Sequence, residues 1–432
     1  MNNNFYNAFS KANVNHKILS FLTCFIIISY PSGPFLPDLF LSLSAAYFFY
    51  IYSTKKISFF FNNSIYYFFI LLFLYLILRS FFVDNYLFSI KSSLFYFRFF
   101  LYSLFFFFLF KNFHIFKKLI YFILIVVVTF VVIDTYIQFF FSKDLFGFDH
   151  PDSRLSGPFD EELIVGSYLS KMIPFMLALY FSYKDNLNMF HFFLILSSFV
   201  LVFLSGERTS FFYFLIFIIV FFIFYQFKHK AKMLFLFLIF SFLLLGAALQ
   251  KESVKSRMIE ATFCTMNINL FNIKCSSNTR DEITTKSKRI MLFSSTHEGH
   301  YKSAIKMFKD NFFFGVGPKM FRFNCDKEKY KNRYSCSTHP HNTLLQILSE
   351  LGFIGFIFYF IAIVYLLKKF YMYVFVNKKV LPNHRFSIIM MYLSFFQTFF
   401  FLVPSGQFFN NYLSIMSYIP LGLFFYYVNL YK

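Results

Sequence analysis

The chain alternates between long apolar runs and short polar connections. A helix needs about 20 mostly apolar residues to cross a bilayer, and runs such as Phe211 to Tyr225 recur along the whole chain. Reading for such runs predicts about twelve membrane-spanning helices. We expect them at residues 17–31, 35–53, 59–79, 92–110, 119–141, 163–183, 189–205, 209–226, 233–249, 343–367, 386–403 and 411–430. The pattern predicts an all-α membrane protein, in which the first two runs are alternatively one re-entrant segment broken at the 30–34 turn.

The short connections indicate the orientation of these helices, because Lys and Arg stay on the cytoplasmic side. Basic residues follow every second span, as at Lys55-Lys56 and Lys368-Lys369. This alternation predicts that both termini are cytoplasmic and that a large loop is extracytoplasmic. We expect an N-terminal transmembrane bundle of about nine spans at 1–249, the large periplasmic loop at 250–342, and about three C-terminal spans at 343–432.

Composition narrows the function classes. With 58% hydrophobic and only 14% charged residues, the chain has too little polar surface for a soluble enzyme. The formal net charge of +21 is typical of nucleic-acid binding, but the basic residues lie between apolar segments, where membrane orientation explains them. We therefore expect no nucleic-acid partner. The large loop is itself basic, which is consistent with either an anionic substrate or anionic lipid headgroups.

Four of the five cysteines lie in the large loop. Cys264 and Cys275 enclose ten residues, and so do Cys325 and Cys336, whereas Cys24 lies alone in an apolar run. An extracytoplasmic loop favours two disulfides. A zinc site that uses Cys336 with the nearby histidines is the alternative, but the spacing lacks the C-x2-C pairs of common zinc modules.

Two histidines precede the tenth predicted span. His339 and His341 flank Pro340, and Asn342 is placed to cap the helix that follows. The positive end of a helix disfavours imidazolium, so a histidine here stays neutral and can act as a base. The same position suits a phosphate.

The following span carries residues that packing against lipid does not require. Glu350 is an acid within an apolar run, expected to pair with a cation or to tune the site. Gly352 and Gly355 form a small-residue face for close helix packing.

Other polar residues gather in connections on the same predicted side. Arg208 lies in a very short turn between two spans, where its guanidinium is placed to bind phosphate or carboxylate unless Glu207 neutralises it. Arg154 follows the fifth span in an Arg-Leu-Ser-Gly-Pro-Phe segment. The stretch from His300 to Asp310 predicts an amphipathic helix lying over the membrane.

These elements resemble the O-antigen ligase and O-antigen polymerase family. The resemblance rests on an Arg-x-x-Gly-x-Phe loop, a Ser-x-x-Arg turn, a large loop ending in Gly-x-Gly, and His-Asn-x9-Gly-x-x-Gly entering a span, over roughly residues 130–360. The family contains multi-span, C-type glycosyltransferases of the bacterial inner membrane that act in lipopolysaccharide and polysaccharide biosynthesis. They transfer a glycan from an undecaprenyl-diphosphate carrier to lipid A core or to another carrier-linked chain.

The resemblance implies a role for individual residues. His341 corresponds to the catalytic base, Arg208 to the arginine that binds the diphosphate, and Arg154 to the arginine of the earlier loop. Where the family usually carries a further arginine before the Gly-x-Gly, this chain has His297, so either His297 substitutes or Arg289 reaches in.

The implied reaction is metal-independent and uses no cofactor. Its partners would be the undecaprenyl-diphosphate-linked donor, a glycan or lipid A core acceptor and the bilayer, with the active site on the periplasmic face of the inner membrane. Ligase and polymerase share the motifs and stay open, as does a protein oligosaccharyltransferase of the same superfamily. A transporter or lipid flippase, or a structural or sensor membrane protein, remains an alternative from another class.

Overall fold

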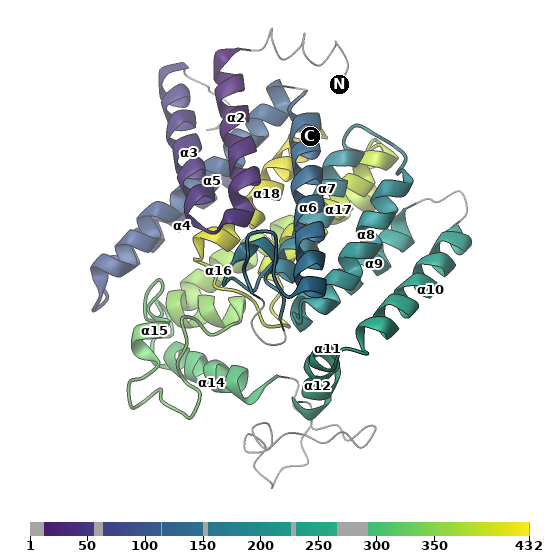
Figure 1. Cartoon of the computed structure of the whole chain (residues 1–432). Coiled ribbons are helices and arrows are strands. Elements are labelled where there is room, and N and C mark those ends of the chain that lie inside the picture. The colour runs from purple at the N-terminus through teal and green to yellow at the C-terminus, as the bar shows by residue number, and fades with distance from the viewer. Residues whose placement is uncertain are drawn as a thin grey trace.

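The computed structural model describes residues 13–55, 64–113, 115–149, 154–225, 230–265 and 293–431. Within these ranges the chain is helical, and its only β-type pairing is one isolated bridge between Lys143 and Asp149. The all-helical fold predicted from the sequence is therefore confirmed for the described residues. Their twelve apolar helices are α2 (Val14–Ser29), α3 (Phe35–Lys55), α4 (Ser64–Phe81), α5 (Tyr86–Asn112), α6 (Phe116–Phe141), α7 (Val165–Phe181), α8 (Met189–Leu204), α9 (Arg208–Phe224), α10 (Lys230–Ala248), α16 (Thr343–Tyr371), α17 (Pro382–Phe399) and α18 (Asn411–Leu430) (Figure 1).

Many of these helices are long and apolar enough to cross a bilayer. Among the described residues, seven meet that criterion by length and composition: α2 together with the following 3-10 turn η1 (Tyr30–Ser32), α3, α5, α6, α10, α16 and α18. The helices α4, α7, α8 and α9 are apolar but shorter. The chain is thus a multi-pass membrane protein, and the total of twelve spans stays a prediction.

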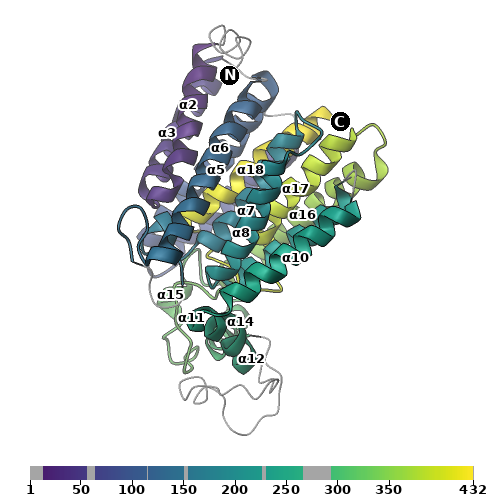
Figure 2. The same cartoon turned by 45° about the vertical axis from the view of Figure 1, so that its right-hand side comes forward.

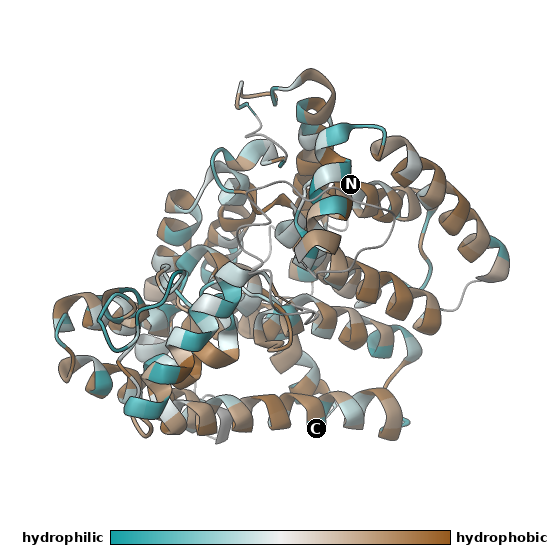
Figure 3. Cartoon of the chain, turned by 90° about the horizontal axis from the view of Figure 1, so that it is seen from below, coloured by the Kyte–Doolittle hydropathy of each residue, from teal (hydrophilic) through white to brown (hydrophobic). Residues whose placement is uncertain are grey.

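Short elements gather at one end of the bundle. They include α11 (Glu252–Lys255), the π-helical turn η4 (Ser256–Glu260), α12 (Ala261–Thr265), α14 (Ser295–Asp310) and α15 (Phe321–Asn324) (Figures 1 and 2). Seen from this end, the bundle is predominantly hydrophobic and the hydrophilic residues gather on a few segments (Figure 3). The start of α2 and the end of α18 both lie at the opposite end. We call the end with α14 the outer end; its periplasmic location stays a prediction.

The bundle core is held by helix pairs that are distant in sequence. Helix α7 packs along α17, and α5 packs along α18. Polar groups buried between α7 and α17 satisfy one another, because the Ser170 hydroxyl donates to Gln397 Oε1 at 2.9 Å and Gln397 Nε2 donates to the Ser170 carbonyl at 2.8 Å. This pairing removes the cost of burying unpaired polar atoms and fixes the register of α7 on α17.

Helix α16 is broken at Gly352, whose φ is 65° and ψ is −162°. The backbone of the preceding loop enters the break: the Val316 and Gly317 N–H groups donate to the carbonyls of Ser349 and Glu350, each at 2.8 Å. A Cβ on Gly352 would lie 2.5 Å from the Phe313 carbonyl oxygen, so only glycine allows this approach. The sequence predicted that Gly352 serves packing against another helix; the structure places it against the backbone of a loop instead.

Candidate functional site

The site forms around His341, at the outer end of α16. Asn342 caps the helix by accepting a hydrogen bond from the Leu345 N–H at 3.1 Å. His341 itself has a φ of 54°, a left-handed conformation that is uncommon for a non-glycine residue and is found often at functional sites. Its carbonyl accepts a hydrogen bond from the Ser405 N–H at 2.9 Å, and its Nε2 lies 3.0 Å from the Ser337 hydroxyl oxygen. These contacts fix the imidazole at the helix N-terminus.

Three further histidines surround His341. The ring centre of His339 is 4.1 Å away, and those of His297 and His300, both on α14, are 5.4 Å away. Ser294 is the N-cap of helix α14, and its side chain accepts a hydrogen bond from the His297 N–H. The helix packs along α16. Residues some 40 positions apart in the sequence are thereby collected into one histidine cluster.

The histidine cluster is neutral at pH 7. Burial lowers the pKa of His341 to about 4, and the neighbouring His297 and His300 lower it further. Burial also lowers the pKa of His339 to about 3, with His341 as the next cause. Burial is also the main cause that lowers the pKa values of His297 and His300. A neutral imidazole can accept a proton, so the cluster can act as a base.

Arg208 is the first residue of α9, and its guanidinium forms no hydrogen bond or ion pair with a described residue. The sequence left open whether Glu207 neutralises it. In the structure the Glu207 carboxylate instead accepts hydrogen bonds from the N–H groups of Gly166 and Ser167, at 2.6 and 3.1 Å, at the start of α7. Capping α7 therefore occupies Glu207 and leaves Arg208 open to a ligand.

Two more arginines join Arg208. Arg154 donates through Nη2 to the Leu163 carbonyl at 3.0 Å, while its buried Nε has no partner in the described part of the chain. Arg257, on η4, has Nε 3.4 Å from the Gly206 carbonyl. Burial lowers the pKa of Arg257, and the charges of Arg154 and Arg208 lower it further. We call these three residues the arginine cluster. Glu207 is close enough to Arg154 to be affected by its charge, and three like charges so close together favour the binding of a further anion.

The arginine cluster and the histidine cluster are neighbours. The pKa of His297 is lowered first by burial, then by His300, and then by the charge of Arg208. His297 is therefore near Arg208, and its ring centre is 5.4 Å from that of His341. An anion bound at the arginines would be next to a base.

Glu350 anchors the loop that borders the cluster. It is fully buried, and its carboxylate accepts hydrogen bonds from the Phe321 N–H at 3.1 Å and from Gln346 Nε2 at 3.0 Å. The sequence proposed that Glu350 pairs with a cation or tunes the site. Its hydrogen bonds come from the backbone of Phe321 and the side chain of Gln346, and it lies close enough to Lys319 to act on its charge. Cys325 and Cys336 form a disulfide, the expected pairing, which ties α15 to the segment leading to the histidines.

Some expected residues are not placed. Arg289 and Cys275 lie outside the described residues, although Cys264 is itself disulfide-bonded. Within the described ranges, no three His, Cys, Asp or Glu side chains are arranged to hold one metal ion. The expected absence of a metal stays a prediction.

Arg257 is the site residue that the sequence did not single out. It follows α10 by nine residues, in a segment with other basic residues, and belongs to none of the motifs. The sequence offers one indication of Arg257: it is a charged residue in a polar segment at the outer end of a predicted span. Only the fold shows that it returns to the Gly206 turn.

Residues 192–360 match a family model described as O-antigen ligase. The matched region contains Arg208, Arg257, His297 and His341, and it begins after Arg154. No curated protein matches the chain. The region 192–360 belongs to the O-antigen ligase family, and the chain is a multi-pass membrane protein whose function is of the ligase or polymerase type.

Proposed function

We propose that the protein transfers a polysaccharide or oligosaccharide from undecaprenyl diphosphate to a sugar of the lipid A core, at the periplasmic face of the bacterial inner membrane. The observation that carries the proposal is the position of the arginine cluster beside the buried His341, whose pKa burial lowers to about 4. A lipid diphosphate is a good leaving group once its charge is stabilised, so a base and several cations suffice.

His341 acts as the general base. Its imidazole accepts the proton of the acceptor hydroxyl while the oxygen forms a bond to the anomeric carbon of the donor sugar. The bond between that carbon and the diphosphate oxygen breaks, and the electron pair leaves with the lipid diphosphate. The proton moves to the histidine and the negative charge to the diphosphate, so the step balances.

Arg208 and Arg154 bind the leaving diphosphate. Arg208 presents a planar fork of donors that has no partner among the described residues, which suits bidentate contact with phosphate oxygens. Arg257 supplies the third cation, and we infer that it takes the place of the arginine that the family carries before the Gly-x-Gly. His297 lies near both Arg208 and His341 and contacts the donor near its phosphate.

Protonation of His341 is coupled to departure of the diphosphate. Burial and two neighbouring imidazoles disfavour a charged His341 in the empty site. Negative charge that develops on the leaving group offsets this cost only as the donor bond breaks. The base is therefore strongest at the transition state, where it is needed.

Replacing His341 with Ala tests the proposal. We expect transfer of glycan to fall at least about 100-fold, because general bases contribute that much or more. The measurement is the surface polysaccharide on a gel, from a strain whose only copy of the gene carries the variant, with the protein level in the membrane checked by immunoblot. His384→Ala is the matched control, since His384 lies at the start of α17 against Tyr431 and away from the cluster. Normal surface glycan in the His341→Ala strain would overturn the assignment.

Deleting the gene separates ligase from polymerase. A ligase leaves the lipid A core without any attached chain, because every chain passes through it. A polymerase leaves cores that carry a single repeat unit. The first gel pattern is the one we expect.

A further inference from the structure

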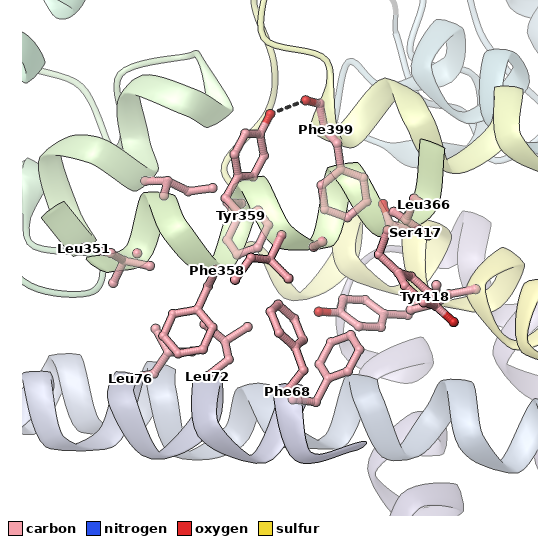
Figure 4. A pocket seen from close by; sticks show the side chains of 18 of the residues that line it. Phe68, Leu72, Leu76, Leu351, Phe358, Tyr359, Leu366, Phe399, Ser417 and Tyr418 are labelled. Atoms are coloured by element: carbon pink, nitrogen blue, oxygen red, sulfur yellow. Dashed lines mark hydrogen bonds between the residues drawn. The ribbon is translucent and has the colours of Figure 1, made fainter. Parts of the chain in front are cut away.

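An apolar pocket of about 240 Å³ lies between α4, α16, α17 and α18. Leu72 and Leu76 of α4 face Leu351 and Phe358 of α16, and Tyr418 of α18 lies at the other side (Figure 4). Along α16 the lining begins before the break at Gly352 and continues after it from Gly355 to Leu366, which is about 17 Å of helix at 1.5 Å per residue. The pocket therefore runs along the apolar part of α16, where a lipid chain would lie.

Most of the hydroxyl groups in the pocket lining already have partners. The Tyr359 hydroxyl donates to the Phe399 carbonyl (Figure 4), and the Ser417 hydroxyl is 2.6 Å from the Thr398 hydroxyl. The remaining lining is almost entirely hydrocarbon and aromatic. The pocket therefore offers burial to an apolar chain and few hydrogen-bonding groups to a polar ligand.

Two cationic residues lie on a segment that is attached beside this pocket. Leu351 lines the pocket, and the preceding Glu350 accepts a hydrogen bond from the Phe321 N–H at 3.1 Å. Phe321 is flanked by Lys319 two residues before it and Arg322 directly after it. Backbone hydrogen bonds thus attach the segment that carries both cations to the wall of the pocket.

Neither of these cations is neutralised by a salt bridge. In the described part of the chain, Lys319 and Arg322 form none, and the buried Nε of Arg322 has no hydrogen-bond partner. The Arg322 guanidinium lies 5.4 Å from the centre of the Phe88 ring, which holds it in place without occupying its donors. Lys319 has a φ of 58°, a conformation that non-glycine residues adopt rarely.

We propose that Lys319, Arg322 and the α4–α16 pocket form a subsite for a phosphate-bearing, membrane-anchored acceptor, with the phosphate at the two cations and the lipid chain in the pocket. The inference rests on the proposed function and assigns residues of this chain to its acceptor side.

The neighbours of the subsite fit an acceptor. The ring centres of His339 and His297 lie 4.1 and 5.4 Å from that of His341. Arg322 is close enough to His339 for its charge to lower the pKa of His339, after burial and His341, and Arg208 acts in the same way on His297, after burial and His300. The two sets of cations therefore approach His341 through different histidines, so a donor diphosphate and an acceptor phosphate can reach the same base.

Fluorescence quenching tests lipid binding directly, because the chain contains no Trp. Phe358→Trp places one reporter in the pocket, and Phe360→Trp places a control reporter at a position on α16 that is 56% exposed and outside the pocket lining. Each full-length variant is reconstituted in nanodiscs with increasing amounts of chain-brominated phosphatidic acid or chain-brominated phosphatidylcholine. We expect phosphatidic acid to quench the pocket reporter several-fold more than phosphatidylcholine, and both lipids to quench the control reporter equally.

Charge variants identify the residues responsible. In the Phe358→Trp background, Arg322→Gln with Lys319→Gln should remove the preference for phosphatidic acid, while Lys306→Gln, an exposed lysine on α14, should retain it. Arg322→Lys keeps the charge and should retain most of the preference, which guards against a folding defect of the double variant. Equal quenching by both lipids in Phe358→Trp, or a preference that survives the double change, would overturn the proposal.

Kinetics distinguish an acceptor subsite from a second donor site. In proteoliposomes, with lipid A core and undecaprenyl-diphosphate-linked glycan extracted from a strain lacking the gene, Arg322→Gln should raise the KM for lipid A core roughly tenfold. The KM for the donor should stay unchanged; the reverse result would refute the acceptor assignment.

The lipid-binding result does not depend on catalysis. If quenching shows the preference while His341→Ala still transfers glycan, the proposed function fails and the phosphate-lipid site stands. If His341→Ala abolishes transfer while the preference is absent, only the acceptor subsite fails.

Discussion

Arg98 and Arg208 are both partly buried arginines at the outer end of the bundle, but they use their guanidinium groups differently. Arg98 donates twice to Asp38 Oδ1, at 2.5 and 3.2 Å, and stacks 4.9 Å from the centre of the Phe99 ring. Arg208 has no such partner, because its neighbouring carboxylate, Glu207, caps α7. One arginine joins α5 to α3, and the other is left for a ligand.

This contrast shows why a charge count does not locate a binding site. Both arginines contribute equally to the net charge of +21. What separates them is whether the fold supplies a carboxylate within reach. A cation is available to a ligand when its neighbouring carboxylate already accepts hydrogen bonds from another part of the chain, as Glu207 does from the start of α7.

Replacing Arg208 is the strongest way to break the contrast. Arg208→Ala should lower the rate of glycan transfer about 100- to 1000-fold, as when one transition-state donor is removed. Arg208→Lys should recover little, since an ammonium group cannot make the bidentate contact. Rates are measured in proteoliposomes with extracted lipid-linked donor, and near-normal transfer in Arg208→Ala would place Arg208 with the structural arginines.

Arg257→Gln extends the comparison to the residue that the motifs did not reveal. Loss of one charge-assisted hydrogen bond to phosphate should lower kcat/KM roughly 10- to 100-fold. Lys255→Gln, two residues away and paired with Glu260 at 3.5 Å, serves as the control and should leave kcat/KM unchanged. Equal effects of the two changes would refute a specific role of Arg257.

Asp38→Asn examines the structural arginine. The pair is only partly exposed, with side-chain exposures of 11% for Arg98 and 28% for Asp38, so its loss should lower the free energy of unfolding by roughly 1–3 kcal/mol. The midpoint of thermal unfolding of the purified protein measures this, and transfer per folded molecule should stay within about twofold. A large loss of transfer without loss of stability would mean that Arg98 also serves the substrate.

The pH dependence of transfer gives the smallest expected effect. A base must be neutral to work, and the lowered pKa of about 4 keeps His341 neutral well below the ordinary histidine range. The acid limb of kcat/KM should therefore lie below pH 6, with activity lost only as the pH falls toward 4. An acid limb near pH 6.5 would show that His341 is not held in the buried, neutral state.

The sequence predicted the helices well because a helix in lipid needs an apolar residue at nearly every position, and such runs are visible directly in the sequence. It also led to His341 and Arg208, since polar groups at the ends of spans are conspicuous. Neither the place of Arg257 in the site nor the hydrogen bonds of Glu207 to α7 could be predicted. Both depend on contacts between segments that are not adjacent in the sequence. Arg289 lies outside the described residues, so its expected role stays a prediction.

The subsite at Lys319 and Arg322 escaped prediction for a related reason. In sequence these residues belong to a basic loop with several similar neighbours, such as Lys327 and Lys329. Lys327 forms a salt bridge with Asp84, and Lys329 forms one with Asp310. Only the folded arrangement shows that Lys319 and Arg322 lie on the segment that Glu350 holds beside the pocket.

The break at Gly352 determines which part of α16 has to enter the membrane. The residues after the break, Phe353–Tyr371, span about 28 Å at 1.5 Å per residue, which matches the hydrocarbon layer without help from the first part of the helix. The segment that carries Gln346, Ser349 and Glu350 can therefore assemble at the interface with the loop, after insertion, and its acid never has to be transferred into lipid. The part of α16 after Gly352 thus crosses the membrane, and the part before Gly352 carries the polar residues of the site.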